Sequence, residues 1–205
     1  MARDRSPIVK QSRREGYALH PKAHKIMVKK TGIPGQHGRD RQGKQSLYAQ
    51  QLREKQKVRR LYGLLEKQFA RLMADANRSQ GQSGEILLQL LERRLDNVIY
   101  RAGLATSRRA ARQLVTHGHF ILNGRRVDIP SIRVAVGDEI VVRPKSLKSS
   151  YFTNIDTVVK DSVQGPLSWL KSDPKKLKVT ITGLPKREEA EADITEQLIV
   201  EYYSR

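Results

Sequence analysis

Residues 91–142 decide the fold of this 205-residue chain, and they read LERRLDNVIYRAGLATSRRAARQLVTHGHFILNGRRVDIPSIRVAVGDEIVV. The first half of the stretch has apolar residues every three or four positions, which is the spacing of an amphipathic helix. Together with the preceding residues it predicts a helix over 84–102 that is capped by Ser83. A second helix is expected to begin after Ser107 and to end at Gly118.

The second half of the stretch predicts a small antiparallel sheet, because its apolar residues change to the period of a β-strand. Residues 120–122 lead into Asn123-Gly124, a pair typical of two-residue hairpin turns, since both residues tolerate the positive φ that such turns need. Arg125 begins the returning strand, and residues 134–142 predict a second hairpin with Gly137-Asp138 at its turn. The stretch therefore predicts two helices packed on a small antiparallel sheet.

The segments on either side are expected to add further helices. Ser46 is a suitable N-cap, and apolar residues from Val58 to Met73 recur at helical spacing, with Gly63 as an interruption. In the last third we expect a helical region over 146–159, a local core at Trp169, a strand over 177–181 and a closing helix, in preference to a strand, over 194–203.

The chain carries 40 Lys and Arg residues against 21 Asp and Glu residues, a formal net charge of +19. Residues 1–60 alone contain 17 basic and 4 acidic residues. Such an excess opposes compact packing unless a polyanion neutralises it, so nucleic acid or an anionic membrane is the expected class of partner. Residues 1–45 have no sustained period and are expected to have little structure alone in water. They form either a disordered tail or an extension that folds against the polyanion.

Composition also excludes several classes of protein. The chain has no cysteine, which excludes disulfides, thiolate catalysis and cysteine-based zinc or iron–sulfur sites. A membrane helix needs about 20 mostly apolar residues, whereas the longest comparable segment, residues 86–95, contains four polar or charged side chains. The first ten residues lack the apolar centre of a signal peptide. We therefore expect a soluble protein that stays where it is made.

Arginines accompany the predicted helices and the first hairpin. A guanidinium group donates two parallel hydrogen bonds to a phosphate, and the predicted helix N-termini near Ser83 and Ser107 add backbone N–H groups. This pattern favours a nucleic-acid-binding face, and a solvated basic surface is the alternative. The arginines concerned are Arg93, Arg94, Arg108, Arg109, Arg112, Arg125 and Arg126.

Residues 91–142 closely resemble the small RNA-binding module named after small-subunit ribosomal protein S-four, which also occurs in RNA-modifying enzymes and some tRNA synthetases. The flanking segments resemble the bacterial ribosomal protein family itself, and the resemblance is collinear across almost the whole chain. It implies an α+β fold, in which a mainly helical N-terminal domain, completed by a C-terminal helix, accompanies a module of two helices on a small antiparallel sheet. The flanking motifs are SRREG at 12–16, PGQHG at 34–38, LREKQKVRRLYG at 52–63 and EQLIVEYYSR at 196–205.

The resemblance also implies how the chain divides into domains. Residues 1–45 would form a basic extension ordered by rRNA, and residues 46–90 would form a helical domain onto which residues 190–205 dock. Residues 91–189 would form an α/β domain that contains the RNA-binding module at about residues 92–150.

The function of the family is implied for this chain in the same way. Its members are structural, non-enzymatic proteins that bind 16S rRNA directly and early at a multi-helix junction and nucleate assembly of the 30S body. They contact ribosomal protein S-five and other small-subunit proteins, line the mRNA entry channel and influence decoding accuracy. Some repress their own operon. The resemblance therefore implies a cytoplasmic, ribosome-bound protein with no cofactor and no membrane partner.

Candidate RNA-binding residues follow from this resemblance and from the basic pattern of the chain. In the N-terminal part they are Arg3, Arg5, Arg13, Arg14, Arg39, Arg41, Lys44, Arg53, Lys55, Lys57, Arg59 and Arg60. In the module they are Arg93, Arg108, Arg109, Arg112, His117, Asn123 and Arg125. We expect no catalytic residue and no metal ligand.

Three other interpretations are weighed against this one. Some family members bind zinc through four cysteines in the N-terminal arm, but here the first pair of positions holds Val9 and Ser12. His20 and His24 lack further soft ligands, so no zinc site is expected. The Arg-Leu-Asp sequence that ends at Asp96 resembles the catalytic motif of pseudouridine synthases, but it lies on a module helix, where Asp96 is expected to pair with arginines. A general nucleic-acid chaperone with a cationic arm is the third alternative.

Overall fold

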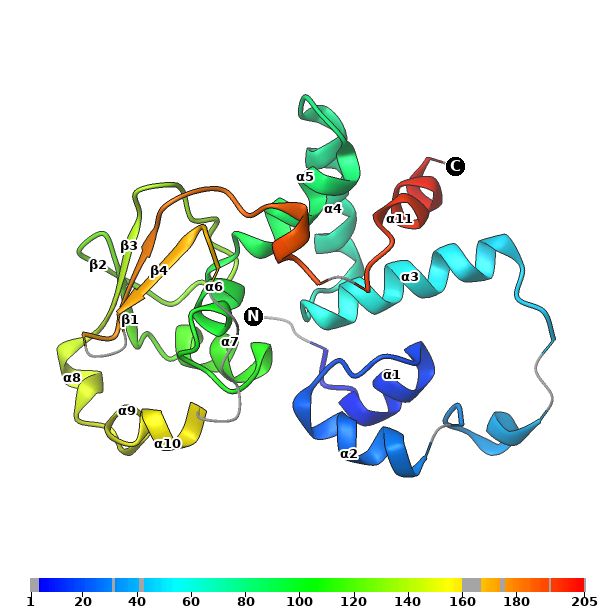
Figure 1. Cartoon of the computed structure of the whole chain (residues 1–205), viewed down its shortest axis with the longest axis horizontal. Helices are drawn as coiled ribbons and strands as arrows, with labels where there is room; N and C mark the ends of the chain where they lie inside the picture. Colours follow the sequence, from blue (N-terminus) through cyan, green and yellow to red (C-terminus); the bar gives the residue numbers. More distant parts are fainter. Residues whose placement is uncertain are drawn as a thin grey trace. The chain divides into compact units, whose positions relative to one another are not determined.

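The chain divides into two compact units (Figure 1). Unit 1 comprises residues 1–87 and 191–205, and unit 2 comprises residues 88–190. The computed structural model describes residues 4–30, 32–40, 43–159, 167–173, 176–191 and 193–204, without the side chains of Arg39 and Asp156. Among these described residues, no helix has the length and apolar character that crossing a membrane requires.

Unit 1 is built from helices, and local signals in the sequence set where they begin and end. Ser46 caps α3 as expected, because its Oγ accepts a hydrogen bond from the N–H of Ala49 at 3.3 Å. The expected interruption at Gly63 separates α3 from α4, since a φ of 66° at this residue lies in the left-handed region that favours glycine. The helices are α1 (Ile8–Glu15), α2 (Pro21–Lys29), η1 (Gln36–Arg39), α3 (Leu47–Leu61), α4 (Glu66–Arg78), the first half of α5 (Ser83–Glu92) and α11 (Glu196–Tyr203).

The core of unit 1 brings together residues from both ends of the chain. Val58 of α3, Phe69 and Met73 of α4, and Ile199 of α11 are all buried. Helix α11, drawn in red in Figure 1, packs against α3. The helix expected in residues 194–203 is therefore confirmed, and burial of its apolar side against α3 explains why the segment is helical.

The N-terminal segment belongs to the same unit. The sequence predicted little structure in residues 1–45 alone in water, whereas the described part of this segment contains α1, α2 and the 3₁₀-helix η1, and α1 packs on both α2 and α3. Leu19 and Ala23 are buried between these elements. That rRNA orders this segment stays a prediction.

Unit 2 contains a helix break where the sequence predicted one continuous helix. Helix α5 ends at Glu92, and α6 (Leu95–Arg101) begins after two further residues. The carbonyl of Arg93 accepts a hydrogen bond from the N–H of Val134, and the N–H of Leu95 donates to the carbonyl of Ile132, both at 2.9 Å. These bonds replace helical ones at the junction, so the continuous helix over 84–102 is a wrong prediction.

The same hydrogen bonds explain why the second predicted hairpin does not form. Residues 132–134 pair with the helix junction, and residues 134–136 lie outside all strands of the described chain. Strand β3 (Glu139–Val142) instead pairs with β1 (Phe120–Leu122) and β5 (Lys178–Ile181). The hairpin predicted over 134–142 is therefore wrong, although its second strand exists.

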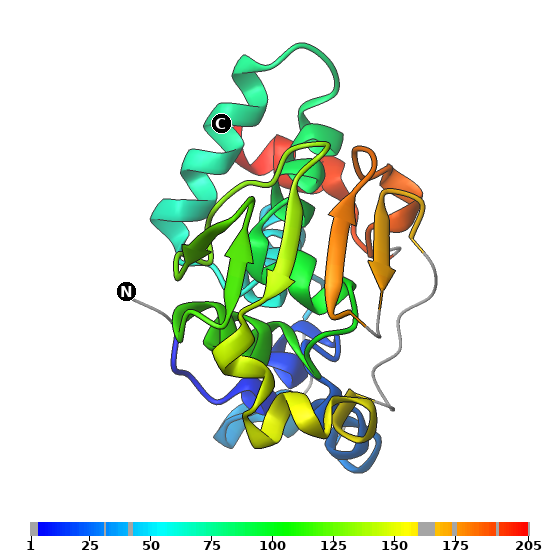
Figure 2. The same cartoon turned by 90° about the vertical axis from the view of Figure 1, so that its left-hand side faces the viewer.

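The sheet of unit 2 has five antiparallel strands in the order β2-β1-β3-β5-β4 (Figure 2). The first hairpin is confirmed, because Asn123 and Gly124 connect β1 to β2 (Arg125–Val127) with φ values of 47° and 79°. The strand expected at 177–181 is β5, and its partner β4 (Leu170–Asp173) had not been predicted.

Helices α6 and α7 (Arg108–Thr116) cover one face of this sheet (Figures 1 and 2). Ile99 of α6 and Val115 of α7 are buried with Phe120 and Ile140 of the sheet. Trp169 is also buried there, so the expected local core is part of the main core of unit 2. The helical region expected over 146–159 consists of three short helices, α8 (Pro144–Leu147), α9 (Ser150–Thr153) and α10 (Ile155–Val159).

We expect the substitution Asn123→Ala to lower the free energy of unfolding of unit 2 by about 1–2 kcal/mol. Alanine is strained at positive φ, and the change removes two side-chain hydrogen bonds, from Asn123 Nδ2 to Asp138 Oδ1 at 2.7 Å and from the N–H of Glu139 to Asn123 Oδ1 at 2.9 Å. Urea unfolding followed by Trp169 fluorescence measures this, because the chain has one tryptophan. The free energy of unfolding of Asn123→Gly should lie between those of wild type and Asn123→Ala, because glycine relieves the strain but does not restore the hydrogen bonds. An Asn123→Ala variant as stable as wild type would contradict the prediction.

Candidate nucleic-acid interface

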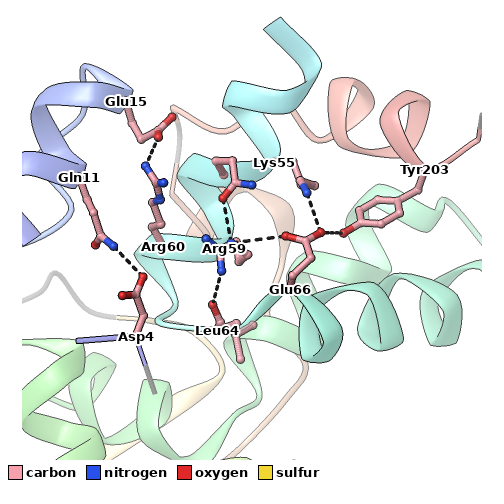
Figure 3. A network of polar contacts seen from close by, with 10 residues as sticks. Asp4, Gln11, Glu15, Lys55, Arg59, Arg60, Leu64, Glu66 and Tyr203 are labelled. Atoms are coloured by element: carbon pink, nitrogen blue, oxygen red, sulfur yellow. Dashed lines mark hydrogen bonds and ion pairs between the residues drawn. The ribbon is translucent and has the colours of Figure 1, made fainter. Parts of the chain in front are cut away.

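The basic residues of α3 that were predicted to contact RNA point into unit 1. Figure 3 shows Arg60 of α3 directed at Glu15 of α1. Arg53 reaches the same carboxylate oxygen, with 3.2 Å between Nη1 and Oε1. The Glu15 side chain is completely buried. Burial raises the pKa of Glu15, although the charges of Arg53 and Arg60 act in the opposite direction.

A second carboxylate holds two more α3 cations and the C-terminal helix. Lys55 Nζ lies 2.6 Å from Oε1 of Glu66, and Arg59 Nε lies 3.6 Å from its Oε2. The Tyr203 hydroxyl of α11 donates to Glu66 at 2.7 Å, and Lys55 also lies 4.5 Å above the Tyr202 ring (Figure 3 shows the Glu66 contacts). One carboxylate therefore joins α3, α4 and α11.

These contacts shift the pKa values of both acidic groups in the cluster. Burial raises the pKa of Glu66, but hydrogen bonds from Lys55 and Tyr203 outweigh it, so that the pKa of Glu66 is lowered. Burial and the neighbouring carboxylate raise the pKa of Tyr203. The ionised form of Glu66 is thus the one that the fold of unit 1 favours.

Lys57 completes the set of α3 cations with partners inside unit 1. Its Nζ lies 2.9 Å from Glu54 and donates to the Asp193 carbonyl at 2.6 Å. The five α3 candidates, Arg53, Lys55, Lys57, Arg59 and Arg60, thus hold α1, α4 and the C-terminal segment onto α3. Their partners in unit 1 give all five a structural role, and whether they also contact RNA stays a prediction.

The remaining candidates divide into exposed residues and residues held by the protein. Arg13 donates from Nε and Nη2 to the Gly32 carbonyl at 2.9 and 2.6 Å, and Arg93 donates to the Val134 carbonyl at 2.9 Å. Arg3 and Arg41 lie outside the described residues, as does the Arg39 side chain. The exposed candidates are Arg5, Arg14, Lys44, Arg109, His117, Asn123 and Arg125.

Two groups of exposed cations in unit 1 were missed by the sequence analysis. Lys22, Lys25 and Lys29 are exposed on α2. Lys67, Arg71 and Arg78 are exposed on α4, opposite its buried apolar residues, and none of the three pairs with an acid among the described residues. Spacings of three, four and seven place such residues on one helix face, so a search for basic helix faces would have found both groups.

In unit 2 the candidate arginines of α7 lie at the edge of a buried polar network. Arg108 Nε donates to Asn97 Oδ1 at 2.8 Å, and Arg112 Nη1 lies 3.1 Å from Asp96 Oδ2. The pairing expected for Asp96 is therefore confirmed. Arg94, which was expected to be presented with the other arginines, is instead buried, because its guanidinium donates two hydrogen bonds to Asp96.

The hairpin contributes an arginine whose position depends on a glycine. Arg126 lies across Gly118, where an added Cβ would fall 2.6 Å from Arg126 Nε. Gly118 follows the last turn of α7, so this contact places a cation at the carbonyl end of that helix, where positive charge is favoured. Together with exposed Arg125 and Arg109, it gives unit 2 a basic region that spans α7 and the β1–β2 hairpin.

Two of the histidines, His20 and His119, have hydrogen-bonding neighbours. His20 Nδ1 accepts from the N–H of Lys22 at 3.1 Å and caps α2. His119 Nδ1 lies 2.9 Å from the Ser146 hydroxyl, and burial followed by the charges of His117 and Arg143 lowers its pKa. Within the described residues there is no group of three or more His, Asp or Glu side chains that could hold a metal ion.

We expect Lys55→Met to destabilise unit 1 by about 1–2 kcal/mol and to speed proteolysis of the C-terminal helix. The change leaves Glu66 without its closest cation, and the cost stays below that of a fully buried pair because the Glu66 side chain is 46% exposed. Urea unfolding followed by far-UV circular dichroism, together with limited chymotrypsin digestion, which cleaves after the leucine and tyrosines of α11, measures it. Lys67→Met is the matched control on the exposed face of α4, and equal loss in both variants would contradict the role given to Lys55.

The lowered pKa of Glu66 predicts a pH-dependent difference between wild type and Glu66→Gln. A carboxyl group whose pKa is lowered by folding stabilises the fold at pH values above its ordinary pKa of 4.5. This contribution is lost as the pH falls through the lowered pKa. Wild type should therefore be more stable than Glu66→Gln at pH 7, and the difference should shrink in acid. Melting temperatures of both proteins from pH 7 to pH 3 test this, and a difference that grows in acid would refute it.

Two family models match consecutive segments of the chain, and full-length relatives are similar to all of it. The family model described as Ribosomal protein S4/S9 N-terminal domain matches residues 3–92, and the model described as S4 domain matches residues 93–140. Small ribosomal subunit protein uS4 of Chloroflexus aurantiacus is 51% identical over 207 residues. The proteins of the same name from Clostridioides difficile and Chlorobaculum tepidum are 49% and 47% identical. Each alignment covers 100% of both chains. As residues 91–142 and their flanking motifs had indicated, the chain belongs to the uS4 family of small ribosomal subunit proteins, which is not a family of enzymes.

Proposed function

We propose that this chain is a structural component of the small ribosomal subunit that binds 16S rRNA directly and nucleates assembly of the 30S body. Family membership supports this function, and one structural observation carries it. Glu15 and Glu66 in unit 1 and Asp96 in unit 2 pair with cations of the protein itself, while further cations remain exposed on α2, α4, α7 and the β1–β2 hairpin. An excess of +19 that is not cancelled inside the protein needs a polyanion outside it.

The proposed mechanism is electrostatic and geometric. Lysines and arginines displace counterions condensed on RNA phosphates, and this release drives binding. Rigid helices fix the spacing of the cations, so a folded RNA is recognised mainly by its shape and backbone. In unit 1 we assign the contacts to Arg5, Arg14, Lys22, Lys25, Lys29, Lys44, Lys67, Arg71 and Arg78, and in unit 2 to Arg108, Arg109, Arg112, His117, Asn123, Arg125 and Arg126. Arg3, Arg39 and Arg41 stay predicted contacts of the N-terminal part.

Finer roles rest on the resemblance of the sequence to its family. We propose that the protein acts early at a multi-helix junction of 16S rRNA in the cytoplasm and remains ribosome-bound. Contact with ribosomal protein S-five, a position near the mRNA entry channel, an influence on accuracy and repression of its own operon belong to the same proposal. Co-sedimentation with 30S particles and chemical probing of 16S rRNA test the first of these roles.

The salt dependence of binding should report the number of phosphate contacts. With about ten contacts, the logarithm of the affinity for a 16S junction fragment should fall with the logarithm of salt concentration at a slope of roughly −7 to −9. Filter binding or fluorescence anisotropy over a range of KCl concentrations measures the slope. A slope shallower than about −3 would contradict a mechanism of this kind.

Removing the exposed lysines of α2 separates junction recognition from general attraction to nucleic acids. The triple variant Lys22→Ala, Lys25→Ala and Lys29→Ala should bind the junction fragment about tenfold or more weakly and reduce the slope by about 2–3, since each phosphate contact contributes about 0.7–0.9. A charge-matched control replaces Lys145, Lys148 and Lys171 of unit 2, which are also exposed. Equal losses in both variants, with equal affinity for duplex DNA, would favour the general chaperone instead.

A further inference from the structure

We propose that Asn97 is a positioning residue that orients Arg108 for contact with an RNA phosphate. The inference rests on the proposed function, and it concerns a residue that the pattern of basic side chains does not reveal. Asn97 is buried in the first turn of α6, whereas Arg108 is a partly exposed residue at the start of α7. The amide of Asn97 connects the interior of the module to its basic surface.

The hydrogen bonds of Asn97 fix the orientation of its amide. Nδ2 donates to the Glu92 carbonyl at 3.1 Å and to Glu92 Oε2 at 2.7 Å. With both hydrogens on Nδ2 directed at Glu92, the carbonyl oxygen Oδ1 faces the other way and accepts from Arg108 Nε at 2.8 Å. Two acceptors on one side and one donor on the other thus determine which end of the amide meets the arginine.

Glu92 is itself held in place by the protein. Arg101 donates from Nε and Nη2 to the two oxygens of Glu92, at 2.9 Å each, and this bidentate geometry fixes the plane of the carboxylate. Glu92 and Asn97 are 1% and 2% exposed. Buried polar groups that are fully connected in this way are rigid, so the position of Oδ1 is defined by the interior of unit 2.

A second contact restricts Arg108 from the side. The carbon at the centre of its guanidinium lies 4.7 Å from the centroid of the Tyr100 ring, which is within the range of a cation–π interaction. The ring and the Asn97 carbonyl hold the same planar group at two points. An arginine that is already ordered loses less conformational entropy when it binds a phosphate than one that moves freely in solvent.

The choice of asparagine at this position has a chemical reason. A carboxylate here would lie beside Glu92 and would pair with Arg108 as an ion, as Asp96 does with Arg112 at 3.1 Å. The neutral amide orients Arg108 through a hydrogen bond and adds no negative charge beside it. Asn97 therefore sets the direction of Arg108 without competing with an RNA phosphate for its charge.

A double-mutant cycle on RNA affinity tests the proposal. The full chain and the variants Asn97→Ala, Arg108→Ala and the double variant are titrated with the 16S junction fragment at fixed salt. We expect each single variant to bind about five- to tenfold more weakly, and the double variant to bind no more weakly than Arg108→Ala alone, because Asn97 acts through Arg108. Asn97→Ala should also lower the salt slope by less than the roughly 0.7–0.9 lost in Arg108→Ala, since the charge itself remains.

Two further variants separate positioning from stability. Tyr100→Leu removes the ring but leaves the buried hydrogen bonds, and it should weaken RNA binding without adding to the effect of Arg108→Ala. Asn154→Ala is the matched control, since Asn154 is an exposed asparagine of unit 2 that bonds to the Ser150 carbonyl. It should leave RNA affinity unchanged. Unfolding followed by Trp169 fluorescence confirms that each variant is folded at the temperature of the binding experiment.

The outcomes distinguish failure of the positioning role of Asn97 from failure of the proposed RNA-binding function. Losses from Asn97→Ala and Arg108→Ala that multiply in the double variant would overturn the positioning role and leave the proposed function standing. The positioning role would also be overturned, with the proposed function intact, if Arg108→Ala left RNA affinity unchanged while wild type binds the junction fragment tightly. If wild type shows no preference for the junction fragment, the proposed function fails, and the positioning role fails with it.

Discussion

The structure depends on a few carboxylates that each hold more than one cation. Glu15 holds Arg53 and Arg60, and Glu66 holds Lys55 and Arg59. In a chain with a net charge of +19, clustered cations repel one another unless a negative group lies between them. Glu15 is buried and Glu66 is half-exposed, and removing either acid would leave neighbouring cations without their counter-charge. Loss of such a partner is costly where the remaining charge is buried, so these acids help to determine which helices pack together.

Carboxylates in unit 2 also pair with arginines, but they do more than join helices. Asp96 contacts Arg94 and Arg112, and Glu92 contacts Arg101. The side chain of Arg112, which we assign to RNA, is 13% exposed, against 5% for Arg94 and 8% for Arg101. Acids in unit 1 therefore join helices to one another, while acids in unit 2 also support the basic groups that we assign to RNA.

The features that sequence reasoning predicted correctly are those determined by neighbours along the chain. The caps at Ser46 and Ser107 and the Asn123-Gly124 turn each depend on one or two residues and on local backbone geometry. The helix break at Arg93 could not be predicted in this way, because it is stabilised by hydrogen bonds from residues 132–134. The inward direction of the α3 cations was missed for a similar reason, since Glu15 becomes their partner only in the folded unit.

The contact between Tyr203 and Glu66 has a consequence for the order in which the chain matures. Synthesis proceeds from the N-terminus, so α11 emerges after the α3 helix that it packs on and after the whole of unit 2. Until α11 has emerged, Lys55 and Glu66 lack the tyrosines that contact them in the folded unit. A nascent chain at that stage carries its cationic α3 helix without one of its partners, and unit 1 can be completed only after α11 is available.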